Sequence, residues 1–151
     1  MIELDLPDEA ATIRLGEAVS RALRPGDLVC LSGPLGAGKS SLARGLIRAL
    51  TSPDEEVPSP TFTLVQSYDG DLPLAHFDLY RLTSPDEAFE LGLDEALEEG
   101  AAVVEWPQRL EGRLPEDRLD IELSFNDKGE GRRARLTPHG AWEGRGIEFR
   151  A

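Results

Sequence analysis

The chain of 151 residues is long enough for one hydrophobic core, which favours a single domain over residues 1–151. Its formal net charge of −13 opposes direct binding to nucleic acid, because such a chain can neutralise few phosphates. No run approaches the length of a membrane span and the first residues do not resemble a signal peptide, so we expect neither membrane association nor secretion. The single cysteine, Cys30, excludes an internal disulfide and is interpreted as a small core residue, which together with these features predicts a cytoplasmic protein.

The first predicted element is a helix that begins at residues 8–9. Asp8 is suited to cap it, and Glu9 lies in the first turn, where the helix dipole favours an acid. Apolar residues then recur at helical spacing, at Leu15, Ala18, Val19, Ala22 and Leu23. Residues 24–27 end this helix and lead into residues 28–31, an apolar run that is typical of a buried strand.

Residues 33–40 have the pattern G-x-x-x-x-G-K-[ST], the P-loop that binds the phosphates of nucleoside triphosphates. Its glycines let consecutive backbone amides point at one anion, and the helix that follows adds the positive end of its dipole. We expect Lys39 to offer a mobile charge to the β- and γ-phosphates from the solvent side of the empty protein, and Ser40 to offer an oxygen to Mg²⁺. A buried strand before the loop and helical spacing after it argue against the alternative, a glycine-rich turn before an ordinary helix. The predicted nucleotide-binding residues of this segment are Gly33, Leu35, Gly36, Ala37, Gly38, Lys39, Ser40 and Ser41.

An exposed loop is expected at residues 51–61, which contain three prolines and three acids. The hydroxyls of Ser59, Thr61 and Thr63 stand at the entrance to the next strand, where nucleotide switch loops sense a γ-phosphate, although spacing alone favours a stiff connector.

Two strands are predicted at residues 62–68 and 74–79, joined by a hairpin loop. Because the chain has only two histidines, we expect no histidine metal site, and His76 is interpreted as a satisfied core or edge residue. Asp78 places a carboxylate within an apolar strand. Acids at such positions are rare unless they are paired or linked to a metal, so a functional role and a buried salt bridge stay open as alternatives.

A capping box with proline at the first helical position, residues 84–87, predicts a short helix that ends near Gly92, and residues 94–99 are interpreted as an acidic, solvated turn. Residues 101–104 are a small apolar run that ends in Glu105. Ligands of open α/β sheets bind at the carboxyl ends of the strands, so Glu105 is the first choice for the acid on the Mg²⁺ side, directly or through water. Trp106 either stacks in the site or covers the surface.

The last predicted elements are two strands, at residues 119–125 and 132–137, that form an antiparallel hairpin. The arginines at 132, 133 and 135 more often make a solvated face than a site, although they also suit a phosphate or an acidic partner, and no arginine is expected at a finger position beside the P-loop. Together the elements predict an α/β fold of the P-loop NTPase class. It is a three-layer sandwich whose mostly parallel central sheet is extended by antiparallel strands and the C-terminal hairpin.

The order of these motifs resembles the TsaE family of bacterial tRNA threonylcarbamoyladenosine biosynthesis ATPases. The resemblance rests on the P-loop and on four further stretches, residues 6–12, S-P-T-F-T-L-V at 59–65, H-F-D-L-Y-R at 76–81 and V-E-W-P at 104–107. It implies an ATPase that uses ATP and Mg²⁺, is weak alone, and is stimulated by a two-protein threonylcarbamoyl transferase core of the TsaD and TsaB type. It also implies that tRNA is met only indirectly, through that complex.

The resemblance further implies roles for individual residues. The loop around Thr61 would act as a switch near the γ-phosphate, and Glu9 and Thr12 would lie near the adenine. The implied catalytic residues are Lys39, Thr61, Asp78 and Glu105, and the implied Mg²⁺ ligands are Ser40, Asp78 and Glu105. Two departures from the commoner family pattern are Ser40-Ser41, which replaces a threonine pair and keeps its hydroxyls, and Pro34, which stands where an acid is common.

Other functions fit a P-loop. A small-molecule kinase needs a substrate-binding acid soon after the P-loop helix and an arginine-rich lid, whereas the D-x-D at residues 69–71 lies in a predicted hairpin turn. A GTPase needs N-K-x-D and D-x-x-G, which this sequence lacks. A nucleotide-dependent assembly clamp, in which hydrolysis is incidental, is the alternative that the sequence does not separate from an ATPase.

Overall fold

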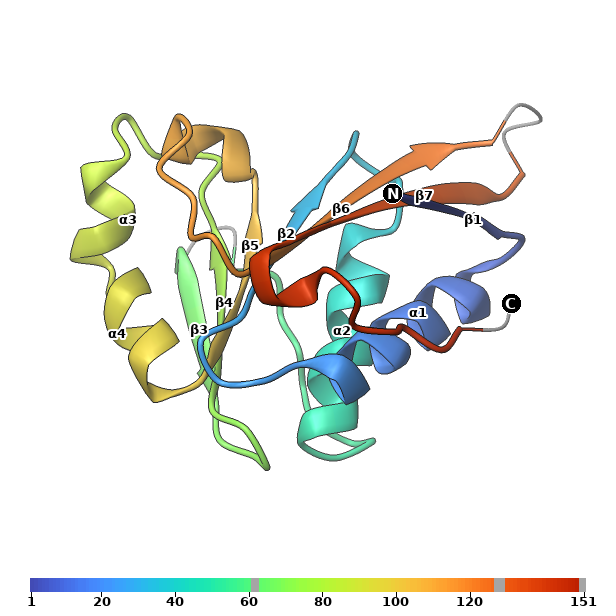
Figure 1. The fold of residues 1–151 in the computed structure, drawn as a ribbon, viewed down its shortest axis with the longest axis horizontal. Coiled ribbons are helices and arrows are strands. Elements are labelled where there is room, and N and C mark those ends of the chain that lie inside the picture. The colour runs from blue at the N-terminus through green and yellow to red at the C-terminus, as the bar shows by residue number, and fades with distance from the viewer. Residues whose placement is uncertain (61–62, 127–129, 150–151) are drawn as a thin grey trace.

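The structure, a computed structural model, describes residues 1–60, 63–126 and 130–149. Their strands form one seven-stranded sheet in the order β1-β7-β6-β2-β5-β4-β3 (Figure 1). The central strands β6, β2, β5 and β4 run parallel, and β3, β7 and β1 are each antiparallel to the inner neighbour. The strands are β1 (Ile2–Leu6), β2 (Leu28–Ser32), β3 (Val65–Tyr68), β4 (Leu74–Asp78), β5 (Ala101–Glu105), β6 (Arg118–Phe125) and β7 (Arg132–His139).

Helices cover both faces of the sheet. Figure 1 shows α1 (Glu9–Ala22) and α2 (Lys39–Leu50) together on one face, and α3 (Asp86–Glu90) and α4 (Leu93–Glu99) on the other. Alternate residues of β2 belong to two separate cores: Val29 packs in the cluster that contains α1 and α2, and Leu28 in the cluster beneath α3 and α4. Two short 3₁₀ helices, η1 (Pro107–Leu110) and η2 (Gly140–Trp142), follow β5 and β7. The predicted three-layer α/β fold is confirmed.

The starts of the first two helices differ in a way that matters for the site. Asp8 caps α1 as predicted, because its Oδ1 accepts a hydrogen bond of 2.8 Å from the amide of Ala11. The cap of α2 is Gly38 in the left-handed region, and no side chain bonds to the first turn of that helix. The first amides of α2 are therefore left for a ligand, as anion binding at a helix N-terminus requires.

The structure differs from the local predictions at four places. The N-terminal residues form the edge strand β1, for which no element was predicted. Residues 93–99 form α4 instead of a turn, because Leu93 is buried against the sheet and Gly92 starts the helix from a left-handed conformation. The capping box at α3 is displaced, since Glu87 accepts hydrogen bonds from the amide and hydroxyl of Thr83 and not from Ser84. The predicted strand from 62 begins at Val65, and residues 61–62 lie outside the described residues.

Cys30 is a core residue, as predicted. It is buried in β2, and burial, with the nearby charge of Asp120 as a smaller cause, raises the pKa of its thiol far above the ordinary value. The thiol therefore stays protonated and unreactive in the folded protein. In the described part of the chain, no helix is long and apolar enough to cross a membrane.

Candidate functional site

The P-loop connects β2 to α2 and curls tightly against β6. Gly33 has φ +140°, and a Cβ at this position would lie 2.3 Å from the carbonyl oxygen of Leu123. No residue with a side chain fits there without moving the backbone, so glycine at this position is a requirement of the fold. Ala37, another predicted binding residue of the loop, is fully buried, so its contribution is confined to the backbone and to packing.

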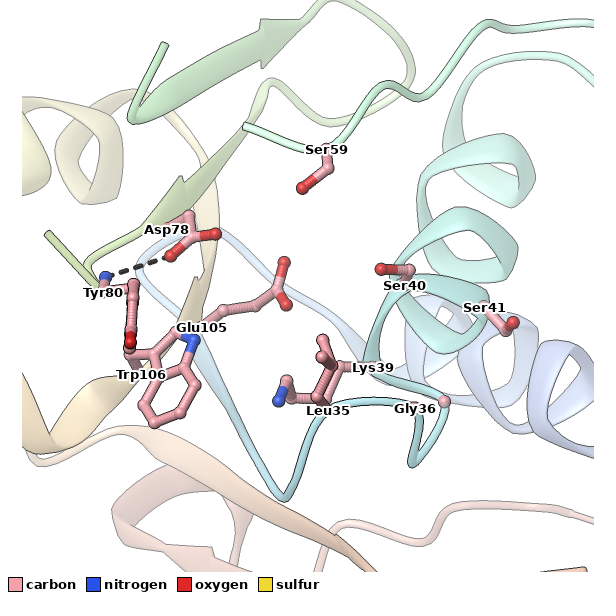
Figure 2. A pocket seen from close by; sticks show the side chains of 11 residues that line it. Leu35, Gly36, Lys39, Ser40, Ser41, Ser59, Asp78, Tyr80, Glu105 and Trp106 are labelled. Carbon is pink, nitrogen blue, oxygen red and sulfur yellow. Dashed lines mark hydrogen bonds between the residues drawn. The ribbon is translucent and has the colours of Figure 1, made fainter. Parts of the chain in front are cut away.

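A pocket of about 580 Å³ lies above the loop (Figure 2). Its volume is in the range of small-molecule sites. It gathers side chains from four parts of the chain that are far apart in sequence: the P-loop and α2, the loop before β3, the end of β4, and the end of β5. The lining residues are Leu35, Gly36, Gly38, Lys39, Ser40, Ser41, Ser59, Asp78, Tyr80, Glu105 and Trp106.

Lys39 lies against the protein and not on the solvent side, which corrects the prediction. The residue is only 8% exposed. Its Nζ donates a hydrogen bond to the carbonyl oxygen of Gly33 and lies 4.9 Å from the centre of the Trp106 ring. A carbonyl and an aromatic face both attract an ammonium group, so the side chain has partners inside the loop.

Asp78 and Glu105 end adjacent parallel strands and stand opposite each other in the β4–β5 register. Both residues are buried, and Figure 2 shows their carboxylates pointing into the pocket, toward the side from which Ser40 presents its hydroxyl. Asp78 Oδ1 also accepts a hydrogen bond of 3.0 Å from the amide of Tyr80. Two carboxylates so close together repel, and two carboxylates with a hydroxyl are the oxygen ligands that Mg²⁺ prefers. The donor set therefore fits a magnesium ion.

Trp106 lines the pocket instead of covering the outer surface. Its backbone has φ 61° and ψ 52°, a left-handed conformation that costs a non-glycine residue about 1–3 kcal/mol. This turn directs the indole toward Lys39. The ring centre of Tyr80 lies 4.9 Å away at a tilt of 49°, so the two aromatic rings together form one wall of the pocket.

The remaining predicted residues lie elsewhere. Glu9 and Thr12 line a second pocket of about 160 Å³ on the other side of the P-loop, which also includes Gly36, Gly38 and Ser41. The P-loop thus separates them from the acids, although both pockets share its residues. Glu9 is paired with Arg44 at 2.9 Å. Thr61 lies outside the described residues, while its neighbour Ser59 lines the main pocket.

Three residues at the site were not assigned to it from the sequence, although His76 was interpreted as a core or edge residue and Arg132 was among the arginines that suit a phosphate. Tyr80 forms part of the pocket wall, and its spacing two residues after Asp78 was the available signal. His76 contacts Glu105, which only the strand register reveals. Arg132 lies over the ring of Phe125 and donates to the carbonyl oxygen of Gly36 at 3.2 and 3.1 Å, so an arginine does contact the P-loop, on the side of the second pocket.

Comparison with known proteins identifies relatives of this chain both by sequence and by structure. A profile of the family described as threonylcarbamoyl adenosine biosynthesis protein TsaE matches residues 6–134. One relative is the Treponema pallidum protein named tRNA threonylcarbamoyladenosine biosynthesis protein TsaE. It is 42% identical to this chain over 113 residues, which cover 74% of this chain and 83% of the relative. The corresponding protein of Bacillus subtilis is 41% identical over 119 residues, covering 78% and 72%. The crystal structure of Bacillus subtilis YdiB is similar with a TM-score of 0.76 and 30% identity, covering 94% of this chain and 88% of that one.

Proposed function

The chain belongs to the TsaE family of threonylcarbamoyl adenosine biosynthesis proteins, and from that premise we propose that it is the ATP-hydrolysing subunit of the enzyme that places threonylcarbamoyl on tRNA adenosine. A nucleotide-binding role follows from the family. That the nucleotide is ATP with Mg²⁺, and that ATP is hydrolysed, is our proposal.

The observation that carries the proposal is the meeting of Lys39, Ser40 and the two strand-end acids in one pocket. The P-loop amides and the start of α2 would hold the phosphates, and Lys39 would exchange its contacts with Gly33 and Trp106 for the β- and γ-phosphates. Ser40 and one or both acids would hold Mg²⁺, which supplies positive charge where phosphate oxygens become more negative during phosphoryl transfer. Where only one of the two acids holds the metal, the other would orient the attacking water.

Stimulation by partner proteins is the second part of the proposal. The one arginine that contacts the P-loop among the described residues, Arg132, bonds to the outer carbonyl of Gly36, on the side away from Asp78 and Glu105. Lys39 is the one cationic side chain among the residues that line the main pocket. Closure of the loop around Ser59 and Thr61 is therefore the step that a partner would promote. The partners we propose are a two-protein transferase core of the TsaD and TsaB type, in the cytoplasm, with tRNA bound through the complex.

Reconstitution tests the proposal. The rate of ATP hydrolysis is measured for this protein alone and with the purified transferase core, and we expect the core to raise it. Repeated tRNA modification is then compared with ATP and with a non-hydrolysable analogue. We expect ATP to support repeated tRNA modification and the analogue not to support it. Equal support by the analogue would favour the assembly clamp, and failure to bind either nucleotide would overturn the proposal.

A further inference from the structure

His76 and Glu105 form a buried pair beside the pocket. His76 is the middle residue of β4 and is 2% exposed, and its Nε2 is 2.7 Å from Oε2 of Glu105. In the strand register His76 stands opposite Val103, while Glu105 stands opposite Asp78. The contact is therefore diagonal: it joins a residue of β4 to the residue of β5 two positions further toward the phosphate edge of the sheet.

The surroundings of the imidazole fix which nitrogen donates. A carboxylate only accepts hydrogen bonds, so Nε2 of His76 must carry the proton in this contact. The other ring nitrogen, Nδ1, is buried and has no hydrogen-bond partner among the described residues. A proton on Nδ1 would be a buried donor without an acceptor, which is unfavourable. The geometry thus places the proton of this hydrogen bond on Nε2.

We propose that His76 is a positioning residue for Glu105: it holds one carboxylate oxygen by a hydrogen bond, so that the other oxygen faces the phosphate pocket. This inference rests on the proposed function, because Glu105 acts there as a metal ligand or water-orienting base. Glutamate has three rotatable side-chain bonds, and the neighbouring carboxylate of Asp78 repels it. A fixed donor beneath Glu105 opposes both effects and keeps its free oxygen in one place before the nucleotide arrives.

If His76 has this role, the activity of a His76 variant depends on whether its side chain places a hydrogen-bond donor at the position of Nε2. In His76→Gln the amide nitrogen stands at the same distance along the side chain as Nε2, and in His76→Asn it stands at the distance of Nδ1. Only the glutamine can donate to Glu105. If His76 only filled the core, glutamine and asparagine at this position would not differ in this way. Leu136→Ala is a matched control for lost stability, because Leu136 is buried in β7, far from the acids in the sheet order.

Hydrolysis by the protein with its partner core is the first measurement. We expect His76→Asn and His76→Ala to lower kcat about 10-fold with nucleotide affinity nearly unchanged, and His76→Gln to retain most of the rate. We further expect His76→Ala to add no further loss when combined with Glu105→Ala, because it acts through that carboxylate. Independent, multiplying losses, or a fully active His76→Ala protein, would overturn the proposal.

Nitrogen-15 NMR of the two imidazole rings provides a second measurement that needs neither nucleotide nor hydrolysis. His139→Gln identifies the signals of His76. We expect the Nε2-protonated form in the unsubstituted protein and a mixture of both tautomers in Glu105→Gln, in which a neutral amide replaces the carboxylate. An Nδ1-protonated ring in the unsubstituted protein would overturn the proposal even if the variants do not fold. If instead the NMR result holds while no ATP is hydrolysed under any condition, the proposed function has failed and the pairing itself has not.

Discussion

At the scale of single residues, Lys39 should matter most for nucleotide binding. We expect Lys39→Ala to weaken ATP binding at least about 10-fold, since a hydrogen bond to a charged group contributes about 1.5–3 kcal/mol. The fold should persist, because the substitution removes only one hydrogen bond to a carbonyl group and one interaction with an aromatic ring. Titration calorimetry measures the affinity. Arg48→Ala removes a positive charge from the same helix where it bonds to Glu55, outside the pocket, and should bind ATP normally. An unchanged ATP affinity in Lys39→Ala would contradict the assignment of residues 33–40 as a phosphate-binding P-loop.

The two acids should affect hydrolysis more than binding. We expect Glu105→Ala and Asp78→Ala to lower kcat by about 100-fold with a much smaller change in ATP affinity, because charge stabilisation and water positioning act mainly in the transition state. Glu105→Gln should lose activity while keeping an acceptor for His76, which separates chemistry from folding. If Asp78 is instead only structural, its loss should lower the free energy of unfolding by about 3–5 kcal/mol. A variant that melts early and hydrolyses ATP normally when folded would decide for that interpretation.

The same residues show how far sequence alone reaches. Lys39, Asp78 and Glu105 could be chosen from motif spelling, because each residue type suits one chemical task at the end of a strand or the start of a helix. The placement of Lys39 against Trp106 could not be predicted from the sequence, since it depends on a left-handed backbone at Trp106 that no local pattern signals. The contact between His76 and Glu105 could not be predicted either, because it depends on the register between β4 and β5.

At the scale of elements, β1 illustrates the same limit. Residues 2–6 alternate apolar and acidic side chains, which is a strand pattern, but so short a strand forms only where an edge receives it. β7 provides that edge, and Glu3 and Asp5 pair with Arg135 and Arg133 across it. The helix α4, in contrast, was not predicted, because it has only seven residues and acids surround its buried face.

The helices α1 and α2 pack directly against each other. A Cβ on Gly45 of α2 would lie 2.3 Å from the carbonyl oxygen of Ile13 in α1, so the helix backbones are in close contact here. We expect Gly45→Ala to lower the free energy of unfolding by about 1–3 kcal/mol and the melting temperature by about 2–12 °C.

The matched control for this substitution is Gly146→Ala, where a Cβ would meet no atom within 4 Å and the backbone is not left-handed. It should change the stability by less than about 0.5 kcal/mol. Thermal unfolding by circular dichroism measures both variants. Equal melting temperatures for the two would show that α1 and α2 can separate without loss, which contradicts the packing seen here.

At the scale of the whole molecule, the basic residues near the C-terminus that the structure describes already have partners within the protein. Residues 128–151 have six basic and three acidic residues, a local charge of +3 within a chain of −13. Within the described part of this segment, Arg133 and Arg135 pair with acids of β1, Arg132 bonds to the P-loop, and Arg145 is buried with Asp27 at 2.6 Å. The suggestion that this segment offers its charge to a phosphate or an acidic partner therefore loses most of its support.

Weak tRNA binding by the isolated protein follows from this distribution. Most non-specific affinity for nucleic acid comes from releasing counterions as lysines and arginines neutralise phosphates. In this protein the arginines just described already have partners, and the rest of the chain has a strong excess of acidic residues. Few phosphates can therefore be neutralised, and long-range repulsion opposes the approach of tRNA. We expect a dissociation constant for tRNA weaker than about 10⁻⁴ M at physiological salt, the weak end of non-specific binding. Gel shifts of tRNA with this protein, with the transferase core, and with both together measure it. Lowering the salt to about 50 mM should strengthen binding by the core far more than binding by this protein. Tight binding of tRNA by this chain alone at physiological salt would contradict the view that tRNA is met only through the complex.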